Sequence, residues 1–157
     1  MNLFSKKNHS YIVVVQMKLN TSEIKNRLAD KGLRVTPQRM VILEAVYNLN
    51  NHPTADNIIE YIRQKHPGIA TGTVYKVLET LVLNGLIKKV TTDRDIMRYD
   101  GILENHHHLY CSECDLIADY HDNELDVLLR KYFENKNLPG FHIEKFVLQI
   151  NGTFDKC

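Results

Sequence analysis

The sequence predicts an α+β fold in which four helices and a β-hairpin precede a small segment rich in strands. Three observations support this prediction: helical spacing of apolar residues up to residue 85, strand-like patterns after it, and a change of charge near residue 101. With 157 residues, 43% of them apolar and 25% charged, the chain is long enough for one or two small domains. This composition excludes a fibrous or mainly disordered protein.

The first two predicted helices begin at residues that favour helix caps. Asn20, with Glu23 three residues later, has the pattern of a capping box, and Gly32 ends this helix. Thr36 followed by Pro37 predicts the start of the second helix, because proline is favoured in the first helical position. The apolar stripe of the second helix consists of Val41, Leu43, Val46 and Tyr47.

The third and fourth helices have similar signals. Thr54 is expected to cap the third helix, which ends before Pro67. The fourth is expected from about Thr71 to Asn84, with Gly85 closing it. The inward residues are Ile58, Ile59 and Ile62 in the third helix, and Val74, Val77, Leu78, Leu81 and Val82 in the fourth.

Strand patterns follow the fourth helix. Residues 86–91 and 96–99 read as two short strands around a turn at 92–95. Helices closed by a β-hairpin are typical of a winged helix-turn-helix, in which the last helix before the wing enters the major groove of DNA.

The rest of the chain is expected to be a small α/β segment. Its strands are predicted at 108–111, 116–121 and 141–150. Between the last two, Asn123 is expected to cap a helix whose apolar side consists of Leu125, Leu128, Leu129, Tyr132 and Phe133. Because about fifty residues bury little apolar surface, we expect this segment to form a homodimer.

Three parts of the chain are therefore expected. Residues 1–16 form an N-terminal extension without a defined structure, and 17–100 form a winged-helix DNA-binding domain. Residues 101–157 form a dimerisation domain that binds metal. The apolar run at 11–15 is too short to be a signal sequence or to span a membrane, so we expect a cytoplasmic protein.

The net charge of +1 is the sum of a basic N-terminal part and an acidic C-terminal part. Residues 1–101 hold 15 basic and 9 acidic side chains, whereas residues 102–157 hold 5 basic and 10 acidic ones. A basic N-terminal half favours nucleic acid as its partner. We expect contacts with DNA from Arg34, Arg39, Thr71, Thr73, Tyr75 and Lys76. For any one of them, an ordinary solvated position is the alternative.

Histidines and cysteines mark a metal-binding region. His106 and His108 point to one face of a strand and His107 to the other, so two imidazoles converge where one ion can use both. Added carboxylates shift the preference of imidazoles from zinc towards iron or manganese. Three histidines on a solvated loop are the alternative interpretation.

Cys111 and Cys114 have the spacing of two thiolates on one tetrahedral zinc ion. Two buried, inert thiols are the alternative. The remaining cysteine, Cys157, permits a three-thiolate site but not a four-cysteine site within one chain. Three cysteines without a secretory signal indicate a reducing compartment.

In order and spacing, four motifs resemble those of the ferric uptake regulator family. They are Leu33-Arg34-Val35-Thr36-Pro37-Gln38-Arg39, His52-Pro53-Thr54-Ala55-Asp56, Thr73-Val74-Tyr75-Lys76-Val77-Leu78 and His106-x-His108-x-x-Cys111-x-x-Cys114. The resemblance covers about residues 20–157. It implies a homodimeric, metal-dependent transcriptional regulator, with an N-terminal winged helix and a C-terminal α/β dimerisation domain.

The resemblance also implies a set of regulatory metal ligands, which are expected to hold Fe²⁺ or Mn²⁺. They are His52, Asp100, His106, His108 and Asp119. Aspartate at positions 100 and 119 resembles the peroxide-sensing branch of the family. In that branch, ferrous iron reacts with peroxide, and the histidines that correspond to His52 and His106 are oxidised. The oxidised regulator then releases its DNA, an operator with two half-sites.

Two positions depart from the family pattern. Phe154 stands where the family usually has a cysteine, so a structural zinc ion would depend on Cys111, Cys114, Cys157 and an outside ligand. Phe146 stands where an additional family metal site uses a histidine, and we expect that site to be absent.

Other functions remain as alternatives. A regulator of iron or zinc uptake, or one that responds to haem, would differ only in its signal. A metal-dependent hydrolase or oxygenase would also use histidines and carboxylates, but five protein ligands leave little open coordination. A metal-buffering protein would show no sequence-selective binding of DNA.

Overall fold

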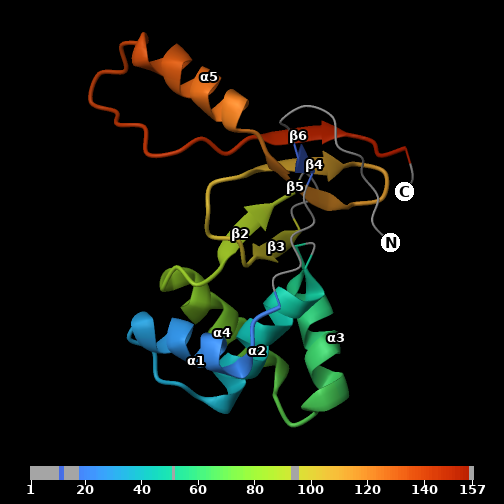
Figure 1. Cartoon of the computed structure of the whole chain (residues 1–157). Helices are drawn as coiled ribbons and strands as arrows, with labels where there is room; N and C mark the ends of the chain where they lie inside the picture. Colours follow the sequence, from blue (N-terminus) through green and yellow to red (C-terminus); the bar gives the residue numbers. More distant parts are fainter. Residues whose placement is uncertain (1–10, 13–17, 51, 93–95, 156–157) are drawn as a thin grey trace. The chain divides into compact units, whose positions relative to one another are not determined.

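In the computed structural model, the described part of the chain consists of residues 11–12, 18–50, 52–92 and 96–155. It contains two compact units with a boundary between Leu103 and Glu104. We call residues 18–103 the helical unit, and residues 104–155 together with 11–12 the sheet unit. Figure 1 labels their helices and strands.

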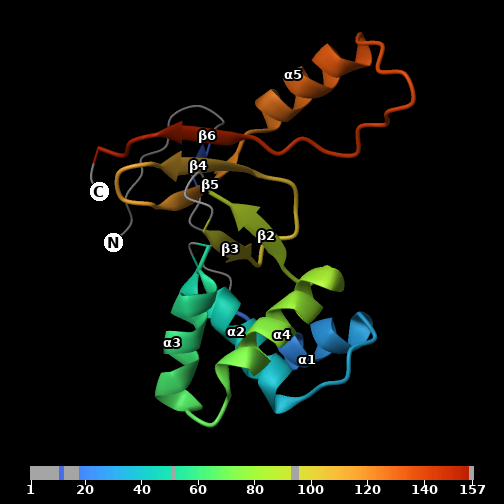
Figure 2. The ribbon, with the colours of Figure 1, turned by 180° about the vertical axis from the view of Figure 1, so that it is seen from behind.

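The helical unit is a bundle of four helices followed by a β-hairpin (Figures 1 and 2). Its elements are α1 (Thr21–Asp30), α2 (Pro37–Leu49), α3 (Ala55–Lys65), α4 (Thr71–Leu83), β2 (Lys88–Thr91) and β3 (Met97–Asp100). The expected caps of the first three helices are present, with capping boxes at Asn20 and Thr54 and a Thr36 cap. Helix α2 contacts the other three helices, so it is central to the core.

The core of the helical unit uses the apolar positions that the helical spacing predicts. Ile24, Leu43, Ile58 and Leu78 are buried in one cluster. In α2 the buried face also includes Ile42, which the predicted stripe omits, while Val41 is only half-buried. The antiparallel pairing of β2 with β3 confirms the predicted hairpin, although its turn at 93–95 lies outside the described residues.

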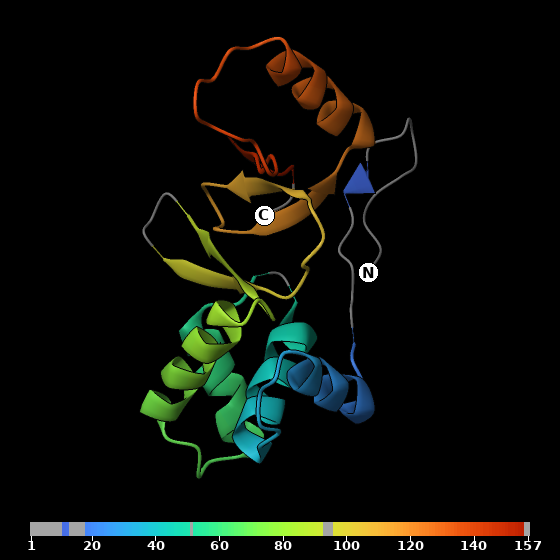
Figure 3. The ribbon, with the colours of Figure 1, turned by 90° about the vertical axis from the view of Figure 1, so that its left-hand side faces the viewer.

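The sheet unit contains four strands in the order β1-β5-β4-β6 and one helix. The elements are β1 (Tyr11–Ile12), β4 (His107–Cys111), β5 (Ile117–His121), α5 (Asn123–Glu134) and β6 (Gln149–Gly152). Strand β4 pairs antiparallel with β5 and parallel with β6. Figure 3 shows α5 and the long connection to β6 extending away from the sheet.

Two local expectations about this unit are wrong, and a strand is present where none was predicted. Asp122, not Asn123, caps α5: its side chain accepts hydrogen bonds from the backbone N–H groups of Glu124 and Leu125. The strand predicted at 141–150 is limited to Gln149–Gly152, because only this end pairs with β4. Tyr11–Ile12 of the expected extension is a strand, which pairs with the edge of β5.

Helix α5 buries none of its residues, although it carries the predicted apolar stripe. Val127, Leu128 and Tyr132 are at least half exposed. The ring of Phe133 stacks on that of Phe146, with 5.2 Å between their centroids. An exposed apolar patch of this kind is typical of a surface that binds another protein.

Candidate metal centre and nucleic-acid interface

The predicted metal ligands form two sets, one in each unit. In the helical unit, His52 precedes α3 and Asp100 ends β3, and both side chains are buried. A ligand atom of His52 and one of Asp100 lie within 4.8 Å of each other. An imidazole and a carboxylate at this separation are suited to share one divalent cation.

Backbone interactions bring these two residues together. The N–H of Tyr99 donates to the carbonyl oxygen of Pro53 at 2.9 Å, and Arg98 Nη1 donates to the carbonyl oxygen of His52 at 3.1 Å. His52 has a φ of +54°, which an L-residue rarely adopts. These bonds hold His52 and Pro53 against β3, with the backbone of His52 in a strained conformation. Arg98 contributes to this contact, a role that the sequence patterns do not reveal.

Gly101 allows the chain to leave β3 close to an aromatic ring. The N–H of Ile102 donates to Asp100 Oδ1 at 2.7 Å, which orients the carboxylate. A Cβ atom added at Gly101 would lie 2.7 Å from Cε1 of the buried Tyr47 ring. Tyr47 is held in turn by Arg27, whose Nη1 donates to its hydroxyl at 2.6 Å.

We therefore expect Gly101→Ala to destabilise the helical unit by about 1–3 kcal/mol, the usual cost of overpacking. It should also weaken metal binding, because Asp100 is the preceding residue. Chemical unfolding and a manganese titration measure the two effects. Gly68→Ala is the control, since nothing lies within 4 Å of the Cβ position at Gly68. Equal stability of the two variants would contradict this role for Gly101.

The sheet unit contributes the other set from the hairpin of β4 and β5. His108 pairs with Asp119 in the register of the hairpin, and His106 precedes β4 on the same face as His108. His106 Nε2 lies 3.0 Å from His108 Nε2 and 3.2 Å from Asp119 Oδ1. All three residues are buried. The predicted convergence of His106 and His108 is confirmed.

The hydrogen bonding of His106 fits a metal ligand. Its Nδ1 lies 3.0 Å from the carbonyl oxygen of Glu104, which can only accept a hydrogen bond, so Nδ1 carries a proton. In the neutral ring, Nε2 then carries the lone pair, which faces His108 and Asp119. A divalent cation would stabilise this group of electron-rich atoms.

A third imidazole of this face, that of His121, is absent from the predicted ligand set. The last ladder pair is His107 with Tyr120, so His106 and His121 face each other just beyond it. Their ring centroids are 5.4 Å apart. Burial lowers the pKa of His121, and nearby His106 lowers it further, while Asp119 opposes the shift. The signal for His121 is the strand register, which the histidine motif alone does not contain.

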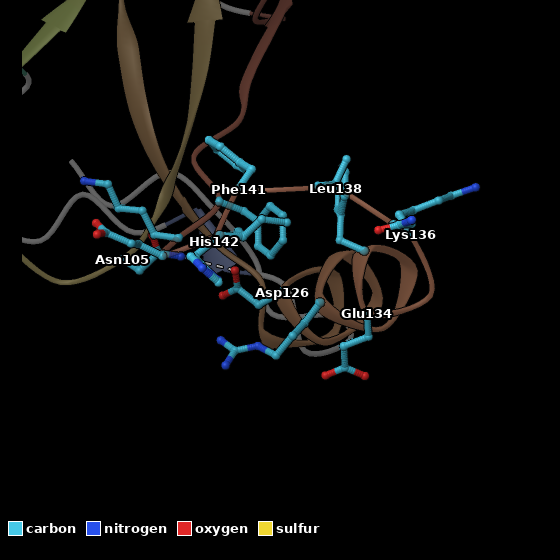
Figure 4. A pocket seen from close by; sticks show the side chains of 14 residues that line it. Asn105, Asp126, Glu134, Lys136, Leu138, Phe141 and His142 are labelled. Carbon is cyan, nitrogen blue, oxygen red and sulfur yellow. Dashed lines mark hydrogen bonds between the residues drawn. The ribbon is translucent and has the colours of Figure 1, made fainter.

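The opposite face of β4 carries His107, whose side chain interacts with other residues of the sheet unit. Leu148 donates its N–H to His107 Nδ1 at 3.2 Å, and His107 Nε2 lies 3.4 Å from Asp126 Oδ1. Asp126 also accepts a hydrogen bond from Asn105 Nδ2 at 3.2 Å. Asn105 and Asp126 line a cavity of about 630 Å³ beside α5 (Figure 4). His107 therefore links β4, α5 and the segment before β6.

The Cys111–Asp115 turn positions the candidate zinc ligands. Cys111 is buried, and the turn is closed by Asp115, whose N–H donates to the carbonyl oxygen of Cys111 at 2.9 Å. A hydrogen bond from the backbone N–H of Cys114 lowers the pKa of the Cys111 thiol against the effect of burial, and those of Phe154 and Glu113 add to the lowering. A stabilised thiolate suits a metal ligand. Cys114 is part of a disulfide in this structure, so it would have to be reduced before it could bind zinc. Cys157 lies outside the described residues.

The predicted DNA contacts gather mainly at the start of α4. Thr71, Tyr75 and Lys76 are exposed, and Thr73 is half-buried. No side chain caps the N-terminus of α4, so its first N–H groups are available to a phosphate. Arg63, which the sequence prediction omits, donates to Thr71 Oγ1 at 3.2 Å and adds a cation there.

The remaining two predicted contacts lie near the start of α2. Arg34 is exposed and precedes the helix, while Arg39 is half-buried in its first turn. Arg39 Nη1 donates to the carbonyl oxygen of Arg34 at 2.8 Å. The structure thus holds the Arg39 guanidinium against the backbone of Arg34, and the side chain of Arg34 is exposed where a phosphate can reach it.

Comparison with known proteins identifies the fold and the family. A model of the ferric uptake regulator family matches residues 30–150. The chain belongs to the ferric uptake regulator family. It is 34% identical over 130 residues to the peroxide operon regulator of Bacillus subtilis, which covers 83% of this chain and 88% of the relative. It is also 34% identical to the peroxide-responsive repressor PerR of Staphylococcus saprophyticus, with 83% and 86% covered.

Solved structures of the family share the fold. The ferric uptake regulator of Helicobacter pylori, described as having three functional metal-binding sites, matches with a TM-score of 0.74 and 21% identity over 89% of this chain and 95% of that one. The Campylobacter jejuni peroxide stress regulator matches with a TM-score of 0.62 and 24% identity, covering 87% and 97%. These matches confirm the predicted α+β class.

No helix among the described residues is both long and apolar enough to cross a membrane.

Proposed function

We propose that this protein is a metal-dependent transcriptional repressor that responds to peroxide. The main support is the ligand chemistry: the sheet unit holds the imidazole of His108 and the carboxylate of Asp119 within 3.2 Å of His106 Nε2, and the helical unit pairs an imidazole with a carboxylate. The chain is also 34% identical to a peroxide operon regulator. The proposed ligands of one Fe²⁺ or Mn²⁺ ion are His52, Asp100, His106, His108 and Asp119.

Sharing these ligands would make the ion a switch. An ion that uses ligands from both units binds an arrangement with all five together more tightly than one in which they are apart. Metal therefore selects one arrangement of the DNA-binding unit. Removal of the metal releases that constraint, and the affinity for DNA falls.

The choice of metal would determine the response to peroxide. Ferrous iron held by these residues would supply electrons for the reduction of hydrogen peroxide, so that one peroxide oxygen would be added to a nearby imidazole ring and the other would leave as water. His52 and His106 are the proposed targets, one in each unit. An oxidised ring is a poorer ligand, so the metal-bound arrangement is lost. Manganese supports repression without this chemistry.

The DNA-bound form would be a homodimer. The exposed apolar residues Val127, Leu128 and Tyr132 of α5 support an interface in the sheet unit. A dimer presents two copies of α4, which fit the two half-sites of a double-stranded operator. Repression of this kind requires no enzymatic turnover, and we expect the protein to act in the cytoplasm.

A structural zinc ion is a further part of the proposal. In the reduced protein, Cys111 and Cys114 would supply two thiolates, Cys157 would supply a third, and a fourth ligand would come from outside the cysteine set. The backbone N–H groups around Cys111 support a thiolate there. Elemental analysis should find one zinc per chain, and this zinc should be absent from Cys111→Ser.

Operator binding tests the regulatory proposal. The full chain, loaded with Mn²⁺ or anaerobically with Fe²⁺, is titrated onto DNA selected from a random pool, with a chelator-treated sample for comparison. Both metals should restore tight, sequence-selective binding, and hydrogen peroxide should abolish it only in the iron-loaded protein. Equal binding with and without metal would refute metal dependence. Peroxide-resistant binding of the iron form would instead favour an uptake regulator.

A further inference from the structure

His121 is a half-buried histidine that the proposed ligand set does not use. It ends β5, two residues after Asp119, so both side chains are on the same face of the hairpin. Its ring lies beside that of His106, with an angle of 31° between their planes. Its Nε2 atom is buried and has no hydrogen-bond partner among the described residues. A buried polar atom of this kind requires a partner, such as a water molecule or an ion.

The hairpin thus carries four candidate ligands in a two-by-two arrangement. His108 is opposite Asp119, and His106 is opposite His121 just beyond the ladder. Three imidazoles with one carboxylate are a suitable ligand set for a first-row transition metal. All four residues belong to the sheet unit, so this set requires no side chain of the helical unit.

We propose that His121 is a reserve ligand, which enables the sheet unit to hold a divalent transition-metal ion when His52 and Asp100 are not bound to it. This inference rests on the proposed function, because the ion is the same one. The hairpin would then retain the metal while the helical unit is released. The protein would therefore lose repression in a first step and lose its metal ion in a second, separate step.

Manganese binding to the full chain tests the inference. The experiment starts from the double variant His52→Ala/Asp100→Ala, which lacks both ligands of the helical unit. Mn²⁺ is a suitable probe because thiolates bind it poorly, so the cysteines do not interfere. Electron paramagnetic resonance gives the free Mn²⁺ concentration, and its pulsed form detects nitrogen from bound imidazoles.

The double variant should still bind one Mn²⁺, with coupling to three imidazole nitrogens. Adding His121→Phe should reduce the affinity by about tenfold or more and leave two imidazoles. Phenylalanine retains the ring beside His106, so the thermal unfolding of the metal-free protein should change little. With His52 and Asp100 intact, His121→Phe should have only a small effect on affinity. His142→Phe, which removes an exposed histidine of the same unit, is the matched control.

Either of two results would overturn the inference: no Mn²⁺ binding by the double variant, or equal affinity and nitrogen coupling with and without His121. These results are distinguishable from failure of the proposed function. That failure would appear in the otherwise unaltered protein, as operator binding that does not depend on manganese.

Discussion

Replacing any of His52, His106 and Asp119 with alanine should abolish operator binding that depends on manganese. Loss of a residue that only orients a metal ligand costs about 10–100-fold in metal affinity, so loss of a ligand itself should cost at least about 100-fold. The effect should be large for His52 in the helical unit and for His106 in the sheet unit, because one ion is proposed to use both. Isothermal titration with Mn²⁺ and DNA binding at fixed Mn²⁺ measure the two consequences.

Matched histidines provide the controls for this prediction. His66 in the helical unit and His142 in the sheet unit are both exposed. His66→Ala and His142→Ala should bind metal and DNA like the unaltered protein. Wild-type operator affinity of both His52→Ala and Asp119→Ala at limiting manganese would refute the five-ligand site. Loss of folding is excluded by comparing the thermal unfolding of the metal-free proteins.

The second large effect is expected at α4. Tyr75 is 47% exposed on this helix, so its ring is available to a base edge. Tyr75→Ala should weaken binding to the selected operator by roughly tenfold to a hundredfold and leave binding to unrelated DNA nearly unchanged. Fluorescence anisotropy with both DNAs provides the comparison. Leu83→Ala is the control, because Leu83 is 78% exposed at the other end of the same helix.

Lys76→Ala should act differently from Tyr75→Ala. A lysine that contacts phosphate contributes to the affinity for every DNA sequence, so both DNAs should bind more weakly. The slope of log affinity against log salt should fall by about one for each phosphate contact removed. If Tyr75→Ala and Lys76→Ala had no effect on either DNA, α4 could not be the recognition helix.

Local signals made the helical unit predictable. The caps at Asn20, Thr36 and Thr54 depend on residues within one turn of the helix, and the structure contains all three. The cap of α5 was misplaced by one residue because Asp122 and Asn123 are both favourable caps. The sequence pattern did not decide between them, whereas the two hydrogen bonds accepted by Asp122 did.

Non-local pairing limited prediction in the sheet unit. Residues 141–148 have a strand-like composition, but a strand also requires a partner, and in this part of the chain only Gln149–Gly152 pairs with β4. The same limit applies to His121. Its place opposite His106 depends on the register of β4 and β5, which the turn after Cys111 determines. By contrast, the two-residue period was sufficient to predict that His106 and His108 share a face.

The central claim is that one ion is bound by ligands from both units, and mass spectrometry of peptides after peroxide tests it most directly. The iron-loaded protein receives a small excess of hydrogen peroxide without oxygen, and a manganese-loaded sample is treated in the same way. We predict that one oxygen atom is added at His52 in some chains and at His106 in others, only when iron is bound. Oxidation confined to one of these histidines, or absent from both, would contradict a shared, peroxide-sensing ion.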